Sequence, residues 1–331
     1  MICKPFALLS SRLPDHTNMP HLFRIITLGC KVNQYESAYL KEAMLSAGLR
    51  QAEIGDKADV VIINTCIVTQ TAARQSRQAI RKAIRENRGS TVAAVGCYAQ
   101  AFPDDLFNLQ GLGVIAGNTK KGQLPEIILD SANSGHKTFL LEDFKPGMPF
   151  EFLQIRRFLD RTRAYLKIQD GCQSFCSYCI VPFSRGPYRS LAPEKVLSML
   201  ESLSDRGCCE VVLTGIHLGK YGIDLEGQTN LNSLLRAIGS EGFPARIRLS
   251  SLEFNEIDSG LMEMMASESW LCRHFHIPLQ SGDNGILRKM KRDYTGQQFA
   301  RTVQAAHETV PLAAIGVDII SGFPGEDQSA H

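Results

Sequence analysis

The sequence predicts an α/β fold in two parts: a doubly wound parallel-sheet domain over residues 23–145 and a partial parallel (β/α) barrel over residues 164–331. Three observations support this. Short β-branched runs alternate with amphipathic helical stretches in both parts. From Ser131 to about Arg161 the sequence is irregular, with Ser-Gly, Pro-Gly and Met-Pro steps, and we assign 146–163 as the linker. A length of 331 residues with 44% hydrophobic content suits two cores.

The first part reads as four strand and helix units. Its apolar strand candidates are Phe23–Leu28, Asp59–Ile63, Thr91–Val95 and Gly113–Ala116, and its helix candidates are Gln34–Ala47, Thr71–Asn87, Pro103–Leu109 and Leu124–Leu129. Alternation of this kind predicts a parallel sheet with helices on its faces.

The second part repeats the pattern. Its predicted strands are Ala164–Gln169, Glu210–Thr214, Arg246–Ser250, His274–Leu279 and Ile315–Ile320, with helices such as Pro193–Ser204 and Gly296–Thr309 between them. Five such units are typical of an arc of a parallel barrel. The sequence stops soon after the fifth strand, so we expect an unpaired strand edge there.

Composition excludes several classes of protein. The formal net charge is only +2, so any basic surface is local. No apolar run is long enough to span a membrane, and we expect a cytoplasmic protein. Ten cysteines are too few for a secreted disulfide scaffold of this size, which favours metal-binding or catalytic thiols.

Cys172, Cys176 and Cys179 form a C-x3-C-x2-C motif directly after the first barrel strand. Three thiolates in one loop can hold a [4Fe–4S] cluster and leave one iron open, whereas structural zinc sites close with four ligands. A zinc knuckle completed by His217, or unliganded core cysteines, are the alternatives. The spacing resembles that of radical S-adenosylmethionine enzymes.

This resemblance implies a cluster whose open iron chelates S-adenosylmethionine, with Tyr178 placed against the adenine. Further cofactor-lining residues are expected at the carboxyl ends of the barrel strands, where such barrels place their active sites. These are Thr214, Gly215, Ser250, Ser251, Gly316 and Gly322. The alternative for these residues is a purely structural role, because glycine and serine at strand ends are ordinary turn residues.

Cys30, Cys66 and Cys97 lie far apart in the sequence, but each directly follows one of the first three predicted strands. Parallel strands bring their carboxyl ends to one edge of the sheet, so three thiols are expected to converge there. The alternative is three independent, half-buried cysteines, which are common in protein cores.

The segments that carry these thiols are 27–37, Asn64-Thr-Cys66 and Gly96-Cys-Tyr98. Together with the C-x3-C-x2-C motif they resemble the methylthiotransferases, which carry two iron–sulfur clusters. Lys31-Val-Asn-Gln34, the loop 215–219 and the segment 276–282 look most like the bacterial branch that acts on N6-threonylcarbamoyladenosine (t6A) in tRNA.

The resemblance implies two [4Fe–4S] clusters and two uses of S-adenosylmethionine. One would methylate a sulfur on the cluster of Cys30, Cys66 and Cys97, and the other would yield a radical that removes hydrogen from C2 of the modified adenosine at position 37. An external electron donor, a sulfur donor and tRNA are the expected partners. The alternatives are isopentenyladenosine or a ribosomal-protein aspartate as substrate, or a noncatalytic metal-binding, RNA-associated protein.

Arginines recur at three- and four-residue intervals in the helix predicted after Cys66, which aligns them on one face. They could pair with tRNA phosphates, or simply form a solvated face. The five are Arg74, Arg77, Arg81, Arg85 and Arg88, and a second basic cluster comprises Arg156, Arg157, Arg161 and Arg163.

Members of this family continue beyond the loop 322–326 with a last barrel strand and a small β-barrel RNA-binding domain. We therefore expect a C-terminally truncated member: a radical SAM barrel that lacks its last strand, with the RNA-binding domain absent. Residues 1–22 have no counterpart and are assigned as an N-terminal extension, in which Met1 or Met19 is the start.

Overall fold

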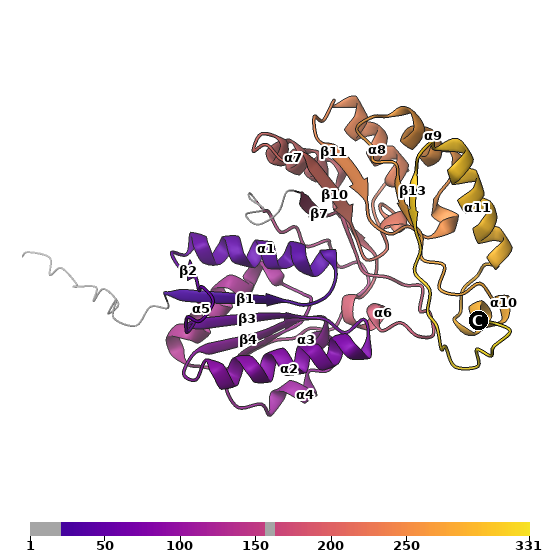
Figure 1. Cartoon of the computed structure of the whole chain (residues 1–331). Helices are drawn as coiled ribbons and strands as arrows, with labels where there is room; N and C mark the ends of the chain where they lie inside the picture. Colours follow the sequence, from indigo (N-terminus) through magenta and orange to yellow (C-terminus); the bar gives the residue numbers. More distant parts are fainter. Residues whose placement is uncertain (1–20, 156–162) are drawn as a thin grey trace, which may run out of the picture.

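The computed structural model describes residues 21–155 and 163–331 (Figure 1). The predicted N-terminal extension, apart from its last two residues, lies outside the described part, and so do both candidate start residues. Arg156, Arg157 and Arg161 of the second basic cluster lie outside it as well.

A parallel sheet of six strands forms the first part of the molecule, in the order β2-β1-β3-β4-β5-β6. From β1 the chain goes to β2 on one side and then crosses to β3 on the other, so the direction of winding reverses between β1 and β3. In sheets of this kind ligands bind outside the carboxyl ends of the strands at that reversal. The strands are β1 (Leu22–Thr27), β2 (Arg50–Gln51), β3 (Val60–Thr65), β4 (Thr91–Gly96), β5 (Leu112–Ala116) and β6 (Thr138–Leu140).

Helices cover both faces of this sheet (Figure 1). Apolar side chains of α1 and α5, such as Leu40 and Ile128, pack with one face, and those of α2 and α3, such as Ile80, pack with the other. Every residue of β3 is buried as a result. The helices are α1 (Lys31–Ser46), α2 (Gln70–Glu86), α3 (Cys97–Ala101), α4 (Asp104–Phe107) and α5 (Leu124–Ser134), with a 3-10 turn η2 (Lys121–Gln123) before α5.

The doubly wound prediction is confirmed, but three details were wrong. The segment 131–161 was expected to be irregular, whereas α5 continues to Ser134 and β6 adds a sixth strand. The two-residue strand β2 was not predicted. Both missed strands are short and lie at the edges of the sheet, where two or three residues give no usable periodicity. The helix α2 ends at Glu86, so Arg88 lies beyond the helix that was expected to carry it.

The second part is an open arc of parallel strands with helices outside it (Figure 1). One sheet has the order β11-β10-β7, and β12 pairs with β13. A bridge between Ile247 and Leu271 connects the two sheets. The strands are β7 (Ala164–Lys167), β10 (Glu210–Thr214), β11 (Arg246–Leu249), β12 (His274–His276) and β13 (Ala314–Gly316).

Within the described residues the arc does not close into a barrel, which agrees with the predicted partial barrel. A small antiparallel hairpin, β8 (Gln169–Asp170) with β9 (Arg189–Ser190), stands at the end of β7. The helices are α6 (Val181–Arg185), α7 (Pro193–Ser204), α8 (Leu231–Ser240), α9 (Ser259–Ser267), α10 (Asn284–Lys289) and α11 (Gly296–Thr309), with 3-10 turns η3 (Leu218–Lys220) and η4 (Phe254–Glu256).

The two parts share a core. Tyr35 of α1 packs in the same buried apolar cluster as the barrel strands, and its hydroxyl donates a hydrogen bond to the carbonyl of Leu153. Leu153 and Ile155, both within the predicted linker, are fully buried in that cluster. The segment before β7 is therefore part of the packed structure, and it fixes the first sheet against the barrel arc. Among the described helices, none has the length and apolar character needed to cross a membrane.

Candidate functional site

The C-x3-C-x2-C loop runs between β8 and α6, and its cysteines line a cavity of 250 Å³. Main-chain hydrogen bonds hold both ends of the loop: Cys172 N–H donates to the carbonyl of Gly186 at 2.9 Å, and Ser177 N–H to that of Met290 at 3.1 Å. The turn into the loop requires glycine, because Gly171 has φ +78° and a Cβ there would meet the carbonyl oxygen of Pro187 at 1.8 Å.

His217 lies beside the first cysteine of this loop. Its Nδ1 is 3.5 Å from Cys172 Sγ, and its Nε2 is 2.7 Å from Glu256 Oε1. Burial lowers the pKa of His217, but the hydrogen bonds with Cys172 and Glu256 outweigh it and raise the pKa to about 9. Burial likewise raises the pKa of Cys172, and the hydrogen bonds from His217 and Ser174 reverse this to a net lowering. A charged imidazolium therefore favours the thiolate form of Cys172.

Arg292 occupies the other side of the cavity. Its Nη1 donates to Glu253 Oε1 at 2.9 Å and lies 3.7 Å from Cys176 Sγ. Its Nε is buried with no partner among the described residues. A buried donor without a partner is costly unless a bound group accepts its hydrogen bond. Arg292 follows α10, far from the cysteines in sequence, and no motif in the sequence pointed to it.

The residues expected to line the cofactor pocket divide into two groups. Tyr178 and Ser251 line the cysteine cavity, and Ser251 Oγ lies 2.7 Å from Nδ1 of His276. The others do not line it: Thr214 ends β10, Ser250 is buried after β11 with an unpartnered Oγ, Gly316 ends β13, and Gly215 and Gly322 lie in loops. Gly215 packs so closely on Gln169 that a Cβ would come within 2.7 Å of its Oε1. A role in holding a cofactor stays a prediction for all seven.

The second set of thiols occupies the carboxyl ends of three adjacent strands of the first sheet. Cys30 follows β1 and caps α1, Cys66 directly follows β3, and Cys97 begins α3 after β4. The reversal of winding between β1 and β3 lies at this edge. Gly29 has φ +99°, and a Cβ there would lie 2.7 Å from Cys66 Sγ. The loops of Cys30 and Cys66 are therefore in direct contact.

Asn33, one turn into α1, ties these loops together. Its Nδ2 donates to the carbonyls of Leu28 at 2.7 Å and Thr65 at 2.9 Å, and its Oδ1 is 3.9 Å from Cys97 Sγ. Burial raises the pKa values of Cys30 and Cys66, and in both cases the neighbouring Cys97 adds to the increase. Cys30 shows this rise although the residue has exposed surface. Thiols close enough to shift one another's pKa values are close enough to ligate one shared metal cluster.

A cluster of buried charges joins this thiol set to the barrel. Arg185, the last residue of α6, donates from Nε to Cys97 Sγ at 3.2 Å, from Nη1 to Glu36 Oε1 at 2.6 Å and from Nη2 to Asn33 Oδ1 at 2.6 Å. The cluster comprises two carboxylates, Glu36 and Asp170, and four cations, Lys121, Lys167, Arg185 and Arg189. We call it the interdomain charge cluster.

The interdomain charge cluster has more positive than negative groups, and every member is buried. Burial raises the pKa of Glu36, but Arg185, Lys121 and Lys167 outweigh it and hold that pKa well below the usual range. Buried excess positive charge is unfavourable unless an anion lies beside it. Cys97 Sγ contacts the interdomain charge cluster through Arg185. The buried positive charge therefore suits thiolate ligands of an iron–sulfur group.

Within residues 21–155 and 163–331, no three His, Cys, Asp or Glu side chains stand in an arrangement that could hold a single metal ion. A [4Fe–4S] cluster is larger than one ion and needs its three thiolates further apart. The donor sets suit such clusters chemically: three thiols line a cavity with an unpartnered arginine Nε, and Cys97 of the second set contacts a buried cluster with excess positive charge.

A second cavity, of 560 Å³, lies between α2, α3 and the C-x3-C-x2-C loop. Ile67 and Val68, which follow Cys66, and Tyr98, which follows Cys97, form part of its wall. Tyr178 lines both this cavity and the cysteine cavity. The described residues thus bring the neighbours of Cys66 and Cys97 and the ring of Tyr178 to the wall of one cavity.

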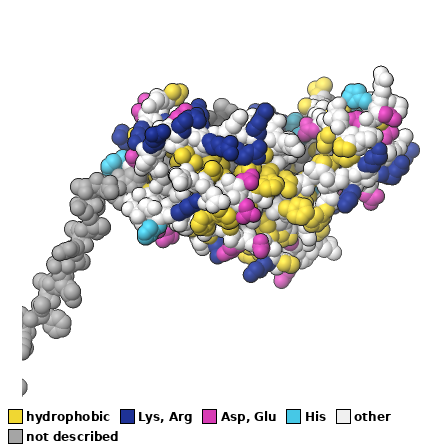
Figure 2. Space-filling view, turned by 90° about the horizontal axis from the view of Figure 1, so that it is seen from below, with side chains coloured by type: hydrophobic (Ala, Val, Ile, Leu, Met, Phe, Trp, Pro, Cys, Tyr) yellow, Lys and Arg dark blue, Asp and Glu magenta, His cyan; other side chains and the backbone are white. Residues whose placement is uncertain are grey.

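The predicted arginine stripe divides in the structure. Arg74 and Arg77 line the 560 Å³ cavity, whereas Arg81 and Arg85 are exposed on α2 and Arg88 is exposed beyond its end. Figure 2, which views the molecule from below, shows Lys and Arg side chains gathered in a row on the half that carries the N-terminal trace, next to apolar side chains.

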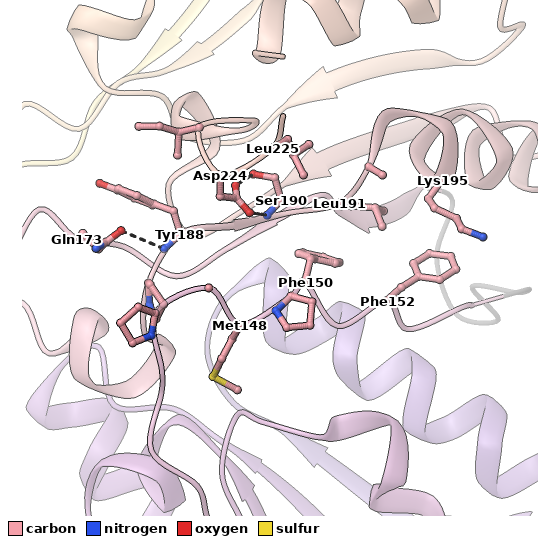
Figure 3. A pocket seen from close by; sticks show the side chains of 16 residues that line it. Met148, Phe150, Phe152, Gln173, Tyr188, Ser190, Leu191, Lys195, Asp224 and Leu225 are labelled. Atoms are coloured by element: carbon pink, nitrogen blue, oxygen red, sulfur yellow. Dashed lines mark hydrogen bonds between the residues drawn. The ribbon is translucent and has the colours of Figure 1, made fainter. Parts of the chain in front are cut away.

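A third cavity, of 830 Å³, lies between the segment before β7 and strand β9 (Figure 3). Met148, Phe150 and Phe152 from the segment before β7 form one wall, and Leu191 and Leu225 form part of the other. Its acidic residue, Asp224, is held by the main chain and hydroxyl of Ser190 at 2.9 and 2.6 Å. No cysteine lines this cavity, so it is distinct from the thiol sites.

Two family models match the chain. The model described as "Uncharacterized protein family UPF0004" matches residues 22–117, and the model of the Radical SAM superfamily matches residues 166–330. Among solved structures, the radical S-adenosylmethionine methyltransferase TsrM from Kitasatospora setae, with cobalamin and a [4Fe-4S] cluster bound, is similar in fold. Its TM-score is 0.65 at 17% identity, over 94% of this chain and 71% of that one.

Curated relatives are more similar in sequence. Threonylcarbamoyladenosine tRNA methylthiotransferase MtaB of Bacillus subtilis is 38% identical over 304 residues, which are 91% of this chain and 67% of that protein. The MtaB of Aquifex aeolicus is 38% identical over 307 residues, 91% of this chain and 73% of that protein. The tRNA-2-methylthio-N(6)-dimethylallyladenosine synthase of Dictyoglomus thermophilum is 32% identical over 314 residues, 94% of this chain and 70% of that protein.

A three-cysteine loop at the carboxyl end of the first strand of a parallel β/α arc, in a chain matched by the superfamily model, defines a radical S-adenosylmethionine enzyme. Such enzymes use S-adenosylmethionine and a [4Fe–4S] cluster. The chain belongs to the methylthiotransferase family of tRNA-modifying transferases.

Proposed function

We propose that the protein converts t6A at position 37 of tRNA to its 2-methylthio derivative. In this proposal Cys172, Cys176 and Cys179 hold one [4Fe–4S] cluster, and Cys30, Cys66 and Cys97 hold a second. When bound, the two clusters and S-adenosylmethionine would supply the radical that removes hydrogen from C2 of the base and the methylthio group that replaces it. An unactivated aromatic C–H needs this kind of cofactor chemistry, because acid and base side chains cannot break it.

One observation carries the proposal: Tyr178 of the C-x3-C-x2-C loop lines both the cysteine cavity and the 560 Å³ cavity. The wall of the 560 Å³ cavity also contains Ile67, which follows Cys66, and Tyr98, which follows Cys97. Arg185 follows the C-x3-C-x2-C loop in sequence, yet its Nε is 3.2 Å from Cys97 Sγ. A nucleobase in this space would lie beside Tyr178 of the C-x3-C-x2-C loop and beside the residues that follow Cys66 and Cys97.

The chain's own residues would hold and orient the reacting groups. His217 favours the thiolate of Cys172, since its imidazolium is fixed by Glu256 on the other side. Arg292 presents an unpartnered Nε, and Ser251 lines the same cavity, so both are placed to donate hydrogen bonds to the carboxylate or ribose of S-adenosylmethionine. Tyr178 offers its ring to the adenine.

Arginines on the exposed face of α2 suit the tRNA backbone. Arg81, Arg85 and Arg88 are exposed and have no ion-pair partner among the described residues, so their guanidinium groups are free to bind phosphates. An external electron donor and a sulfur donor are also needed, because reductive cleavage of the cofactor consumes electrons and the methylthio group consumes sulfur.

The competing substrate is the dimethylallyl (isopentenyl) adenosine of the second group of relatives. We favour t6A because two relatives named for it are 38% identical, against 32% for the dimethylallyladenosine synthase of Dictyoglomus thermophilum. Arg74 and Arg77 in the substrate cavity also suit a charged N6 substituent better than an apolar one.

Nucleoside mass spectrometry on tRNA from a strain that lacks the gene tests this proposal. Loss of 2-methylthio-t6A, with restoration by the wild-type gene and not by one encoding Cys172→Ala, is the expected result. Loss of the 2-methylthio mark on dimethylallyladenosine would favour the competing substrate. An unaltered nucleoside profile would refute the proposed function.

A further inference from the structure

The 560 Å³ cavity combines aromatic rings with paired guanidinium groups. Tyr98, Phe102 and Tyr178 supply the rings, and Arg74 and Arg77 supply the positive charge. The rings of Tyr98 and Phe102 lie 5.8 Å apart, and those of Phe102 and Tyr178 are each more than one-third exposed. Exposed aromatic faces at a cavity wall are suited to stacking on a nucleobase.

Arg77 is held in a fixed position at this wall. Its Nη1 donates to the hydroxyl of Tyr98 at 3.3 Å, and its guanidinium lies 5.6 Å above the centre of that ring. The Tyr98 hydroxyl in turn donates to Asp105 Oδ2. These contacts orient Arg77 without neutralising it by direct ion pairing, so its remaining N–H donors stay available to a ligand.

Arg74 lies one turn earlier on α2 and is exposed, with no hydrogen bond or ion pair among the described residues. The two arginines outnumber the one carboxylate in the cavity wall, that of Asp105, which accepts the Tyr98 hydroxyl. The cavity therefore keeps a net positive charge beside its aromatic rings, and it suits a ligand that carries both a flat apolar ring and an anion.

We propose that Arg74 and Arg77 bind the carboxylate of the threonyl group on the substrate base and so select a charged N6 substituent. This rests on the proposed function and deepens it, because the threonylcarbamoyl substituent carries a carboxylate and the dimethylallyl substituent carries no charge. The exposed ring of Phe102 holds the base, the buried ring of Tyr98 supports Arg77 from below, and the two arginines fix the substituent at the α2 end of the cavity.

The proposal separates two tasks within one row of arginines. Arg81, Arg85 and Arg88 do not line the cavity and are placed to bind backbone phosphates, which carry no information about the modification. Arg74 and Arg77 could in principle bind phosphate as well, since carboxylate and phosphate are both recognised by a guanidinium fork. Binding to the substrate carboxylate and binding to backbone phosphate are distinguishable, because only carboxylate binding depends on the modification.

The experiment measures equilibrium binding of the anaerobically reconstituted protein to fluorescent anticodon stem-loop RNAs that carry t6A or the methyl ester of t6A. The ester removes the charge of the substituent and adds one methyl group to it. The wild-type protein should bind the t6A RNA about 10-fold more tightly than the ester, as expected for hydrogen bonds to a charged group. Arg74→Gln and Arg74→Gln/Arg77→Gln should lower this ratio, the double variant to about 1.

The control is Arg81→Gln/Arg85→Gln. It should weaken binding of both RNAs by the same factor, keep their ratio and reduce the dependence of affinity on salt. Arg74 has no partner in the described structure, so Arg74→Gln gives a result even if Arg77→Gln disturbs the contact with Tyr98. Arg77→Lys should restore part of the ratio, because it keeps the charge and loses the fork.

An equal loss of affinity for both RNAs in the Arg74 and Arg77 variants would overturn the inference and assign these residues to phosphate. A wild-type ratio of 1 would also overturn it, while 2-methylthio-t6A in the nucleoside analysis would leave the proposed function standing. Failure of the proposed function is seen separately, as an unchanged nucleoside profile in the deletion strain.

Discussion

The Nε of Arg185 lies 3.2 Å from the Sγ of Cys97, although the two residues belong to different halves of the chain. Arg185 ends the short helix that follows the C-x3-C-x2-C loop, and Cys97 begins the helix after the third long strand of the first sheet. The same guanidinium binds Glu36 and Asn33 of α1. One side chain therefore fixes the spacing between the two thiol sets and the halves that carry them.

Removal of Arg185 should be strongly destabilising. Arg185→Gln removes the buried hydrogen bonds to Glu36, Asn33 and Cys97, and a hydrogen bond to a charged group contributes about 1.5–3 kcal/mol. The matched control is Arg246→Gln, which removes an arginine with 63% of its side chain exposed from the carboxylate of Glu210 and should cost about 0–1 kcal/mol. Urea unfolding followed by circular dichroism measures both. Similar losses in the two variants would contradict the importance given to the interdomain charge cluster.

Gly29 provides a test of the contact between the loops of Cys30 and Cys66. In Gly29→Ala the new methyl group would lie 2.7 Å from Cys66 Sγ, in addition to the cost of a left-handed backbone at φ +99°. Gly55→Ala has nearly the same φ, +97°, but nothing within 4 Å of its Cβ, so it carries the backbone cost of about 1–2 kcal/mol alone. We expect Gly29→Ala to lower both the melting temperature and the iron content, and Gly55→Ala to lower the melting temperature only. Full iron content in Gly29→Ala would show that the two loops can move apart freely.

The sequence was sufficient to predict the positions of both thiol sets, because strand periodicity and the rule for carboxyl ends of parallel strands are local signals. Cys30, Cys66 and Cys97 follow β1, β3 and β4 as expected. The strand order places β1 and β3 side by side at the reversal of winding. That order was not evident from the sequence, since it depends on the crossover and not on any residue.

The groups around the thiols could not be predicted in the same way. Arg185, Arg292 and Asn33 contact cysteines that lie many residues away, so no spacing connects them. The arginine stripe was predictable only in part. Its helical spacing was evident from the sequence, but only the tertiary packing of α2 against α3 and the cysteine loop places Arg74 and Arg77 in a cavity wall and leaves the outer three arginines outside it. Pairing across the domain boundary is a property of the tertiary structure.

Stability should fall at acid pH because of Glu36. Its pKa in the folded protein is held well below 4.5 by Arg185, Lys121 and Lys167, so the unfolded chain binds the proton first as pH falls. The contribution is fully present above the unfolded pKa of about 4.3 and is lost as pH falls through the folded pKa. Urea unfolding of iron-free protein between about pH 5.5 and 3.5 should show a smaller loss in Glu36→Gln than in the wild type. Parallel curves for the two proteins would assign the acid sensitivity to other carboxylates, such as Asp170.

Iron content separates the two-cluster arrangement from a single cluster. The wild-type protein, reconstituted without oxygen, should contain about eight irons, four for each [4Fe–4S] cluster. Cys30→Ala/Cys66→Ala/Cys97→Ala and Cys172→Ala/Cys176→Ala/Cys179→Ala should each retain about four, because the thiol sets lie in different halves of the molecule and either can be emptied alone. Cys209→Ser, a change at an exposed cysteine that belongs to neither thiol set, should leave the content unchanged. Iron and sulfide analysis with electron paramagnetic resonance of the reduced protein provides the measurement. A wild-type content of about four irons that survives the first triple substitution would leave Cys30, Cys66 and Cys97 without a cluster and reduce the protein to a radical enzyme with one metal centre.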